Sequence, residues 1–362
     1  MKPSAPFLEK LAHLSLLPLF VSLAIIPGII CRPALLHTAP QRAGSAPEVT
    51  KIEPPNWWIG LTPQVLLLLY GHDLEAAHVS CNLSSLRVTR TQATARGDYL
   101  FVWLKIGSDT RSGTAVCRIM TATGPASFEV PLAVRSDGAG KFQGLSPREV
   151  PYFITPKALA DANPGSDKSR AVPGSRDESV NGAHIGGALR QIRGRLKELK
   201  NLGANALRLA PLTVQDSDDQ FHGAADFYSI HAPLGSLRDL QDLVASAHEQ
   251  DMKVILDLDL LRIGEHHPWV SNPPLAEWLG GAANHRDNLS KPSGEPPNAK
   301  PVLDTENPLV ALYILQNSIW WVETAGLDGI HVVRDPGATN QYWRSWRAAL
   351  QKIYPHLAIV GE

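Results

Sequence analysis

The pattern of apolar and polar positions changes along the chain and predicts two kinds of structure. Between Val65 and Val134, short apolar or alternating runs are split by Gly, Asp and Ser, and no amphipathic helix lies between them. Such spacing predicts a small β-sandwich, comparable with immunoglobulin-like modules. We assign this domain to residues 50–136, preceded by a linker over residues 32–52 and followed by a second linker, Ser136–Gly144.

After the second linker, short apolar runs alternate with helical segments. The runs that predict strands are Tyr152–Thr155, Leu207–Ala210, Val254–Leu258, Gly329–Val333 and Ala358–Gly361. Helical spacing predicts helices over Leu189–Leu202, Leu237–Gln250, Pro308–Ala325 and Gln341–Tyr354. Gly203 and Gly326 follow two of these helices as C-terminal caps would. The alternation predicts parallel strands with crossover helices, in either a (β/α) barrel or a doubly wound sheet.

The first residues of the chain predict an export signal. Lys2 and Lys10 precede the apolar stretch Leu11–Ile30, and small residues suited to cleavage follow at Ala43, Ser45 and Ala46. We therefore interpret residues 1–46 as signal peptide and linker, and expect the protein to be exported to the periplasm or the cell exterior. A leader that stays uncleaved and anchors the protein in the membrane is the alternative.

Cysteine content fits an exported chain without deciding the state of its thiols. Cys81 and Cys117 remain after removal of the leader, and a disulfide between them is chemically allowed in an oxidising compartment. Two buried thiols that act as small apolar groups are an equally open alternative. The charge balance of 34 Lys and Arg against 35 Asp and Glu gives a formal net charge of -1, which provides no basic field for a nucleic-acid partner.

Several segments, taken in order, resemble one protein family. They begin with PPNWWIG (Pro54–Gly60) and continue with YFITP, HIGGAL, LKELKNLGANALRLAP, FHGAADFYSI, AHEQDMKVILDLDLLRIGEHH, NPLVALYILQNSIWWVETAGLDGI and IVGE. The first resembles the start of the N-terminal domain of cyclomaltodextrinases, and the seven others follow the order and spacing of the alpha-amylase family, glycoside hydrolase family 13. The resemblance implies an α/β fold, a (β/α)8 TIM barrel with its site at the carboxyl ends of the strands. We expect residues 145–362 to supply about strands one to five of that barrel.

The resemblance also indicates which catalytic groups are present. Retaining glycosidases use two carboxyl groups, one as nucleophile and one as acid/base. The family's nucleophile position matches Val333, and its acid/base position matches Glu362. A valine cannot attack a sugar, so we expect glycosidase activity to be impaired or lost. Asp335, two residues beyond Val333, is the candidate replacement nucleophile, but Arg334 and Pro336 beside it predict a loop.

At other positions too, this sequence lacks residues that the family uses to bind metal or sugar. Asp257 is retained at the third strand, while Leu261 and Arg262 occupy the positions of the calcium-binding asparagine and the sugar-binding histidine. Leucine has no oxygen ligand for calcium, so we expect neither a metal site nor another cofactor. His331 replaces the family's arginine, and Ala224 replaces its sugar-stacking tyrosine. The residues assigned to any remaining substrate contacts are Asp257, Arg262, His331 and His222.

Three functions stay open at this point. The chain is an inactive glycoside hydrolase, a working enzyme for α-1,4-glucosidic bonds in maltooligosaccharides or cyclomaltodextrins, or an exported protein that binds α-glucan through the sandwich. In the third case Trp57 and Trp58 are the candidate sugar platforms, whereas Trp320 and Trp321 are predicted to be helix core. The expected ligand is an α-glucan or maltooligosaccharide. A homodimer is a further hypothesis. Contact with a membrane is expected only through an uncleaved leader. Open edges at strands one and five predict a sticky or poorly folding product.

Overall fold

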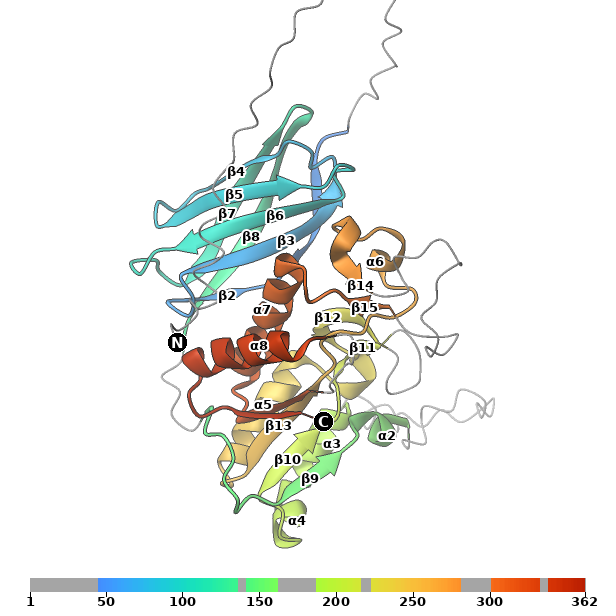
Figure 1. Cartoon of the computed structure of the whole chain (residues 1–362). Helices are drawn as coiled ribbons and strands as arrows, with labels where there is room; N and C mark the ends of the chain where they lie inside the picture. Colours follow the sequence, from blue (N-terminus) through green and yellow to red (C-terminus); the bar gives the residue numbers. More distant parts are fainter. Residues whose placement is uncertain are drawn as a thin grey trace, which may run out of the picture. The chain divides into compact units, whose positions relative to one another are not determined.

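The computed structural model describes residues 45–135, 141–161, 187–215, 223–280, 301–332 and 338–361 (Figure 1). Ala46–Glu362 forms one compact unit. The predicted leader lies outside the described residues, apart from Ser45 and Ala46 at its end. None of the described helices is both long enough and apolar enough to cross a membrane.

The N-terminal part consists of two four-stranded sheets, as the alternating pattern predicted. The first sheet has the order β1 (Glu48–Glu53), β3 (Gln64–His72), β6 (Tyr99–Ile106) and β5 (Leu86–Ala93). The second has the order β2 (Trp57–Ile59), β8 (Gly124–Val134), β7 (Gly113–Thr121) and β4 (His78–Cys81). Strand β1 corrects the expected linker, because residues 48–52 pair with β3 rather than forming a loose connection. Charged residues at both ends of EVTKIE masked this strand in the apolar pattern.

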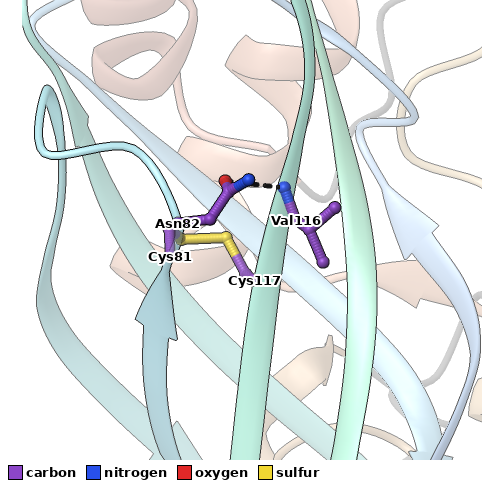
Figure 2. Close-up of a disulfide and its surroundings, with 4 residues drawn as sticks. All are labelled: Cys81, Asn82, Val116 and Cys117. Atoms are coloured by element: carbon purple, nitrogen blue, oxygen red, sulfur yellow. Dashed lines mark hydrogen bonds between the residues drawn. A yellow bond between two sulfur atoms is a disulfide. The ribbon is translucent and has the colours of Figure 1, made fainter.

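Strand β7 illustrates why these residues form a half-buried sheet. Ala115, Cys117 and Ile119 are fully buried, while Val116 and Met120 between and after them are exposed. Period-two burial of this kind directs alternate side chains to the core. Cys117 lies opposite Cys81 on β4, and the two form a disulfide (Figure 2). The disulfide is therefore confirmed over the alternative of two free thiols.

The C-terminal part is built on a five-stranded parallel sheet. Its order is β17 (Ala358–Gly361), β16 (Gly329–Val332), β13 (Lys253–Leu258), β10 (Ala206–Leu209) and β9 (Pro151–Ile154). All four pairings in this sheet are parallel. The strands lie in their order along the chain, without the reversal that marks a doubly wound sheet. Of the two predicted architectures, the barrel type is therefore the one that the described strands follow.

The remaining elements of this part are mainly helices. The helices are α2 (Pro156–Asp161), α3 (Ala188–Gly194), α4 (Leu196–Asn201), α5 (Leu237–His248), α6 (Pro268–Ser271), α7 (Pro308–Ala325) and α8 (Asn340–Ile353). Short 3-10 turns occupy η2 (Ala232–Leu234) and η3 (Ala276–Trp278). Two small antiparallel pairs complete the set: β11 (Thr213–Gln215) with β12 (Ala224–Ile230), and β14 (Leu279–Gly280) with β15 (Val302–Leu303).

Two details of the predicted helices need correction or refinement. The segment Leu189–Leu202 is not one helix, because Arg195 leaves helical geometry (φ -105°, ψ 4°) just after Gly194 and separates α3 from α4. Gly326 does cap α7 in the left-handed conformation, with φ 72° and ψ 41°. Gly203 also has a positive φ of 96°, but it follows the cap residue of α4 rather than being that residue.

Helix α7 joins the two parts of the described structure. Most of its side chains are buried, which is expected of a helix that is apolar on every side. The amide of Gln316 accepts from the Leu66 N–H at 2.8 Å and donates to the Leu66 carbonyl at 2.7 Å. These bonds satisfy backbone groups of β3 beyond the last residue that β1 pairs. Trp320 and Trp321 are each 1% exposed, so the prediction that they belong to the core is confirmed.

A buried carboxylate strengthens the same contact between the sandwich and α7. Glu53, at the end of β1, is 2% exposed and accepts hydrogen bonds from the hydroxyls of Tyr70 at 2.7 Å and Tyr313 at 2.9 Å. The Lys51 ammonium lies 2.6 Å from its other oxygen. Burial, with the charge of Glu53 adding to it, raises the pKa of Tyr313 well above the usual range of a phenol. Both tyrosines therefore remain donors at every ordinary pH.

Candidate functional site

The parallel sheet presents two chemically different faces. Paired residues of parallel strands share a face, and the structure pairs Phe153 with Arg208 and Asp257 with His331. Arg208 also pairs with Ile255, which lies two residues before Asp257 and so on the same face. These polar and aromatic residues therefore share one face of the sheet. The opposite face carries apolar side chains that are at most 1% exposed: Leu207, Leu209, Leu256 and Ile330.

Three side chains from adjacent strands meet on the polar face. Arg208 on β10 donates from Nε to Oδ1 of Asp257 at 2.8 Å and from a terminal nitrogen to Oδ2 at 3.0 Å. The same terminal nitrogen lies 3.0 Å from Nδ1 of His331, which accepts from the permanently cationic guanidinium. His331 and Asp257 approach to 3.4 Å. We call this group the Arg208–Asp257–His331 cluster.

The cluster is more buried at its acidic and imidazole members than at its cation. Asp257 is 5% exposed and His331 is 2% exposed, whereas 29% of the Arg208 side chain is accessible. The guanidinium carbon lies 4.9 Å from the ring centre of Phe153, whose side chain is about half exposed. A buried carboxylate with both oxygens bound to arginine is stabilised as an anion and held in place. Asp257 thus functions as an anchor for Arg208 and His331.

Glycoside hydrolysis by a retaining mechanism needs two carboxyl groups, and the five parallel strands, as far as they are described, hold one. Within the five parallel strands, as far as they are described, Asp257 is the only carboxylate, and Arg208 occupies both of its oxygens. The next acidic residue after it is Asp259, one position beyond β13, whose Oδ1 accepts from the Arg262 N–H at 3.4 Å. A retaining mechanism needs two carboxyl groups about 5–5.5 Å apart across the scissile bond.

The sequence-predicted site residues fall into two groups. Val333, Glu362 and His222, and the alternative nucleophile Asp335, lie outside the described residues. Asp257 and His331 do come together, as part of the cluster. Arg262 lies in the segment after β13, where its backbone bridges to Val302 and its carbonyl accepts from the Ala224 N–H at 3.0 Å.

Arg208 is the residue that sequence reasoning missed. A charged residue inside the apolar strand ALRL is a signal in itself, since a long cation within a packed strand requires a partner. The carboxylate of the neighbouring strand, Asp257, was the available partner. Register between the two strands could not be set from the sequence, so the pair was not predicted.

Two of the positions that the resemblance assigns to calcium and sugar contacts, Leu261 and Ala224, hold buried apolar side chains. Leu261 is 2% exposed and offers no oxygen, so this segment does not fit a calcium ion. Elsewhere in the described ranges, no three His, Cys, Asp or Glu side chains gather as a metal site would require. Ala224 is fully buried, and Trp57 and Trp58 are 0% and 7% exposed. The two tryptophans therefore pack in the core instead of forming an open sugar platform.

Comparison with known families matches both parts of the chain. Residues 51–136 match the family model "Cyclomaltodextrinase, N-terminal", and residues 153–287 match the model "Alpha amylase, catalytic domain". Together with the sequential parallel strands, these matches define a glycoside hydrolase fold of the alpha-amylase type. The chain belongs to the alpha-amylase family and carries the N-terminal domain of its cyclomaltodextrinase members.

Similar proteins include curated enzymes of the same family. The chain is 31% identical over 199 residues to Alpha-amylase 3 of Dictyoglomus thermophilum, covering 49% of this chain and 39% of that protein. It is 25% identical over 229 residues to a cyclomaltodextrinase of Bacillus sp, covering 58% and 40% respectively. A solved Anoxybacillus alpha-amylase aligns with a TM-score of 0.47 at 23% identity, over 59% of this chain and 47% of that one. The matched region spans about two fifths of these curated relatives.

Proposed function

We propose that this protein is a maltodextrin-related member of the alpha-amylase family that binds α-glucan and has lost, or nearly lost, glycosidic hydrolysis. The observation that carries the proposal is the state of Asp257, the sole carboxylate of the described parallel strands, which is committed to Arg208 through both oxygens. The residue at the family's nucleophile position is Val333, which cannot form a glycosyl-enzyme bond.

The ligand class is supported by the relatives and by one exposed side chain. The relatives include proteins named cyclomaltodextrinase, maltogenic amylase and neopullulanase, names that refer to α-glucans. Phe153 is 51% exposed on the polar face, and the Arg208 guanidinium lies over one face of its ring. An aromatic ring of this kind can stack on a sugar ring. We assign glucan contact to Phe153 because Trp57 and Trp58 are buried.

Export and the class of the N-terminal domain belong to the same proposal. The basic and apolar start of the chain predicts an export signal, and the Cys81–Cys117 disulfide favours an oxidising compartment. The two packed four-stranded sheets support an immunoglobulin-like sandwich as the class of the N-terminal domain. A test is the mass of the secreted protein: cleavage near Ala46 supports export, and a full-length protein in the cytosol contradicts it.

Glucan binding is tested with a matched pair of aromatic variants. Tyr152 is 45% exposed and adjoins Phe153, but it points to the opposite face of β9. We expect Phe153→Ala to weaken maltoheptaose binding in calorimetry by roughly three- to tenfold, the range of one stacking contact. Tyr152→Ala should leave the affinity unchanged. Equal losses in both variants, or no maltoheptaose binding by the wild type, would contradict the assignment.

A further inference from the structure

A second site is suggested by a groove on the other side of the sheet. The groove has a volume of about 420 Å³ and lies between the first turns of α8 and the strands β16 and β17. Val332 pairs with Gly361, and Ile330 pairs with Ile359, so the strand residues Val332, Ile359 and Gly361 face away from His331. Val360, which pairs with His331, also lines the groove, so three of the four strand residues that line it lie on the face away from the Arg208–Asp257–His331 cluster.

Two tryptophans of α8 line the groove, and they differ in their hydrogen bonding. The rings of Trp343 and Trp346 meet edge to face, with centroids 5.5 Å apart. Nε1 of Trp346 donates to the Ser318 hydroxyl at 3.1 Å. Nε1 of Trp343 is buried and finds no acceptor among the described residues, but the same holds for Nε1 of Trp269 and Trp278. A buried nitrogen cannot be reached from the groove, so the indole ring is what Trp343 offers a ligand.

Two arginines at the groove are also without partners. Arg344 and Arg347 are exposed and line the groove three residues apart on α8, which places them on neighbouring positions of one helix face. Neither makes an ion pair or hydrogen bond with the described residues. Arg190, Arg193 and Arg208, on the helices and strands of the same part, each hold a carboxylate. Two adjacent free guanidinium groups therefore give this groove a local positive charge.

We infer that this groove binds a sugar carrying a phosphate or carboxylate group. The anion pairs with Arg344 and Arg347, because a guanidinium group can donate to two oxygens of a phosphate or of a carboxylate at once. The indole ring of Trp343 and the apolar strand residues contact the sugar ring. The volume lies within the range of small-molecule sites, about 300–1,000 Å³. A docked acidic helix, about 10 Å across with its side chains, would need a larger surface.

Calorimetric titration of the full chain tests this inference with defined probes. The anionic probes are glucose 6-phosphate and glucuronate, the neutral probe is glucose, and inorganic phosphate reports recognition of the anion alone. We expect both anionic sugars to bind, with glucose and inorganic phosphate each weaker by about tenfold or more. Equal affinity for glucose, equal affinity for inorganic phosphate, or no binding of either anionic sugar overturns the proposal.

Variants separate this groove from non-specific attraction of anions. The double variant Arg344→Gln/Arg347→Gln should lose about tenfold or more in affinity for both anionic sugars, because charge-assisted bonds are removed. Trp343→Ala removes the ring that lines the groove, and should weaken binding severalfold. Arg118→Gln on β7, an exposed arginine far along the chain, is the matched control and should bind as the wild type does. Unchanged binding of the anionic sugars by the double variant contradicts the inference. So does binding of an acidic helical peptide by a protein that binds neither anionic sugar.

Discussion

The Arg208–Asp257–His331 cluster should act as a structural unit, and its removal should be visible in stability. Asp257→Asn keeps the shape of the side chain but removes the charge that holds the guanidinium. Two hydrogen bonds to a charged group are weakened, at 2.8 and 3.0 Å. A fully buried pair costs about 3–5 kcal/mol to break, and partial exposure of Arg208 lowers the expected loss to about 2–3 kcal/mol. Arg208→Met leaves the more buried partner, Asp257, without its cation and should cost at least as much.

The double variant Arg208→Met/Asp257→Asn distinguishes a coupled pair from two independent contributions. With both partners changed, no buried charge is left unpaired, so its loss should fall short of the sum of the single losses by about 1.5–3 kcal/mol. Urea unfolding at neutral pH, followed by tryptophan fluorescence and far-ultraviolet circular dichroism, measures these values. Asp242→Asn, at a more exposed partner of Arg193 and Arg238, is the control and should cost under about 0.5 kcal/mol. Additive losses in the double variant would refute the coupling.

Three further predictions follow from other contacts. Cys117→Ser removes a disulfide that joins residues 36 positions apart, and chain entropy gives a loss of about 4 kcal/mol in unfolding free energy, measured against the oxidised wild type, with the reduced wild type expected to match the variant. Gln316→Ala leaves the Leu66 N–H and carbonyl without partners and should cost about 2–4 kcal/mol in urea unfolding. Burial acts to raise the pKa of Asp239, but hydrogen bonds from Arg190 and Ser236 outweigh it and lower the pKa to about 2. Because the pKa of Asp239 is lower in the folded than in the unfolded protein, this stabilisation is present above about pH 4 and lost as the pH falls towards 2. Asp239→Asn should therefore lower the free energy of unfolding by about 1–2 kcal/mol at pH 7, and this loss should vanish in acid.

The fold could be predicted from the sequence wherever apolar residues recur with the spacing of a single kind of element, helix or strand. Pro308–Ala325 was predicted to its end residues because Asn307 and Pro308 mark its start and Gly326 takes the left-handed cap. The five parallel strands were also located to within about a residue, because each is a short apolar run between helices. Strand β1 was missed because EVTKIE mixes charged and apolar residues, and its stability comes from pairing with β3 and from Glu53 contacts. Tertiary contacts of that kind leave no local signal.

The candidate site was less predictable than the fold. The family resemblance named Asp257 and His331, but it suggested sugar contacts for them, and their partner in the structure is Arg208. Whether a strand residue faces the helices or the other side depends on register, which a sequence does not fix for a short parallel strand. Trp57 and Trp58 were undecided for the same reason, since exposure of an aromatic residue depends on which sheet covers it.

Hydrolysis of maltoheptaose and β-cyclodextrin by the purified, folded chain tests the central claim most directly. Release of reducing ends is compared for the wild type, Val333→Asp and Glu362→Gln, with a thermal scan to establish folding of each. The account predicts no release above the buffer rate for the folded wild type, and no further loss on changing Glu362. Turnover by the wild type that Glu362→Gln abolishes would contradict the account, and would show that a second carboxylate acts where Val333 cannot.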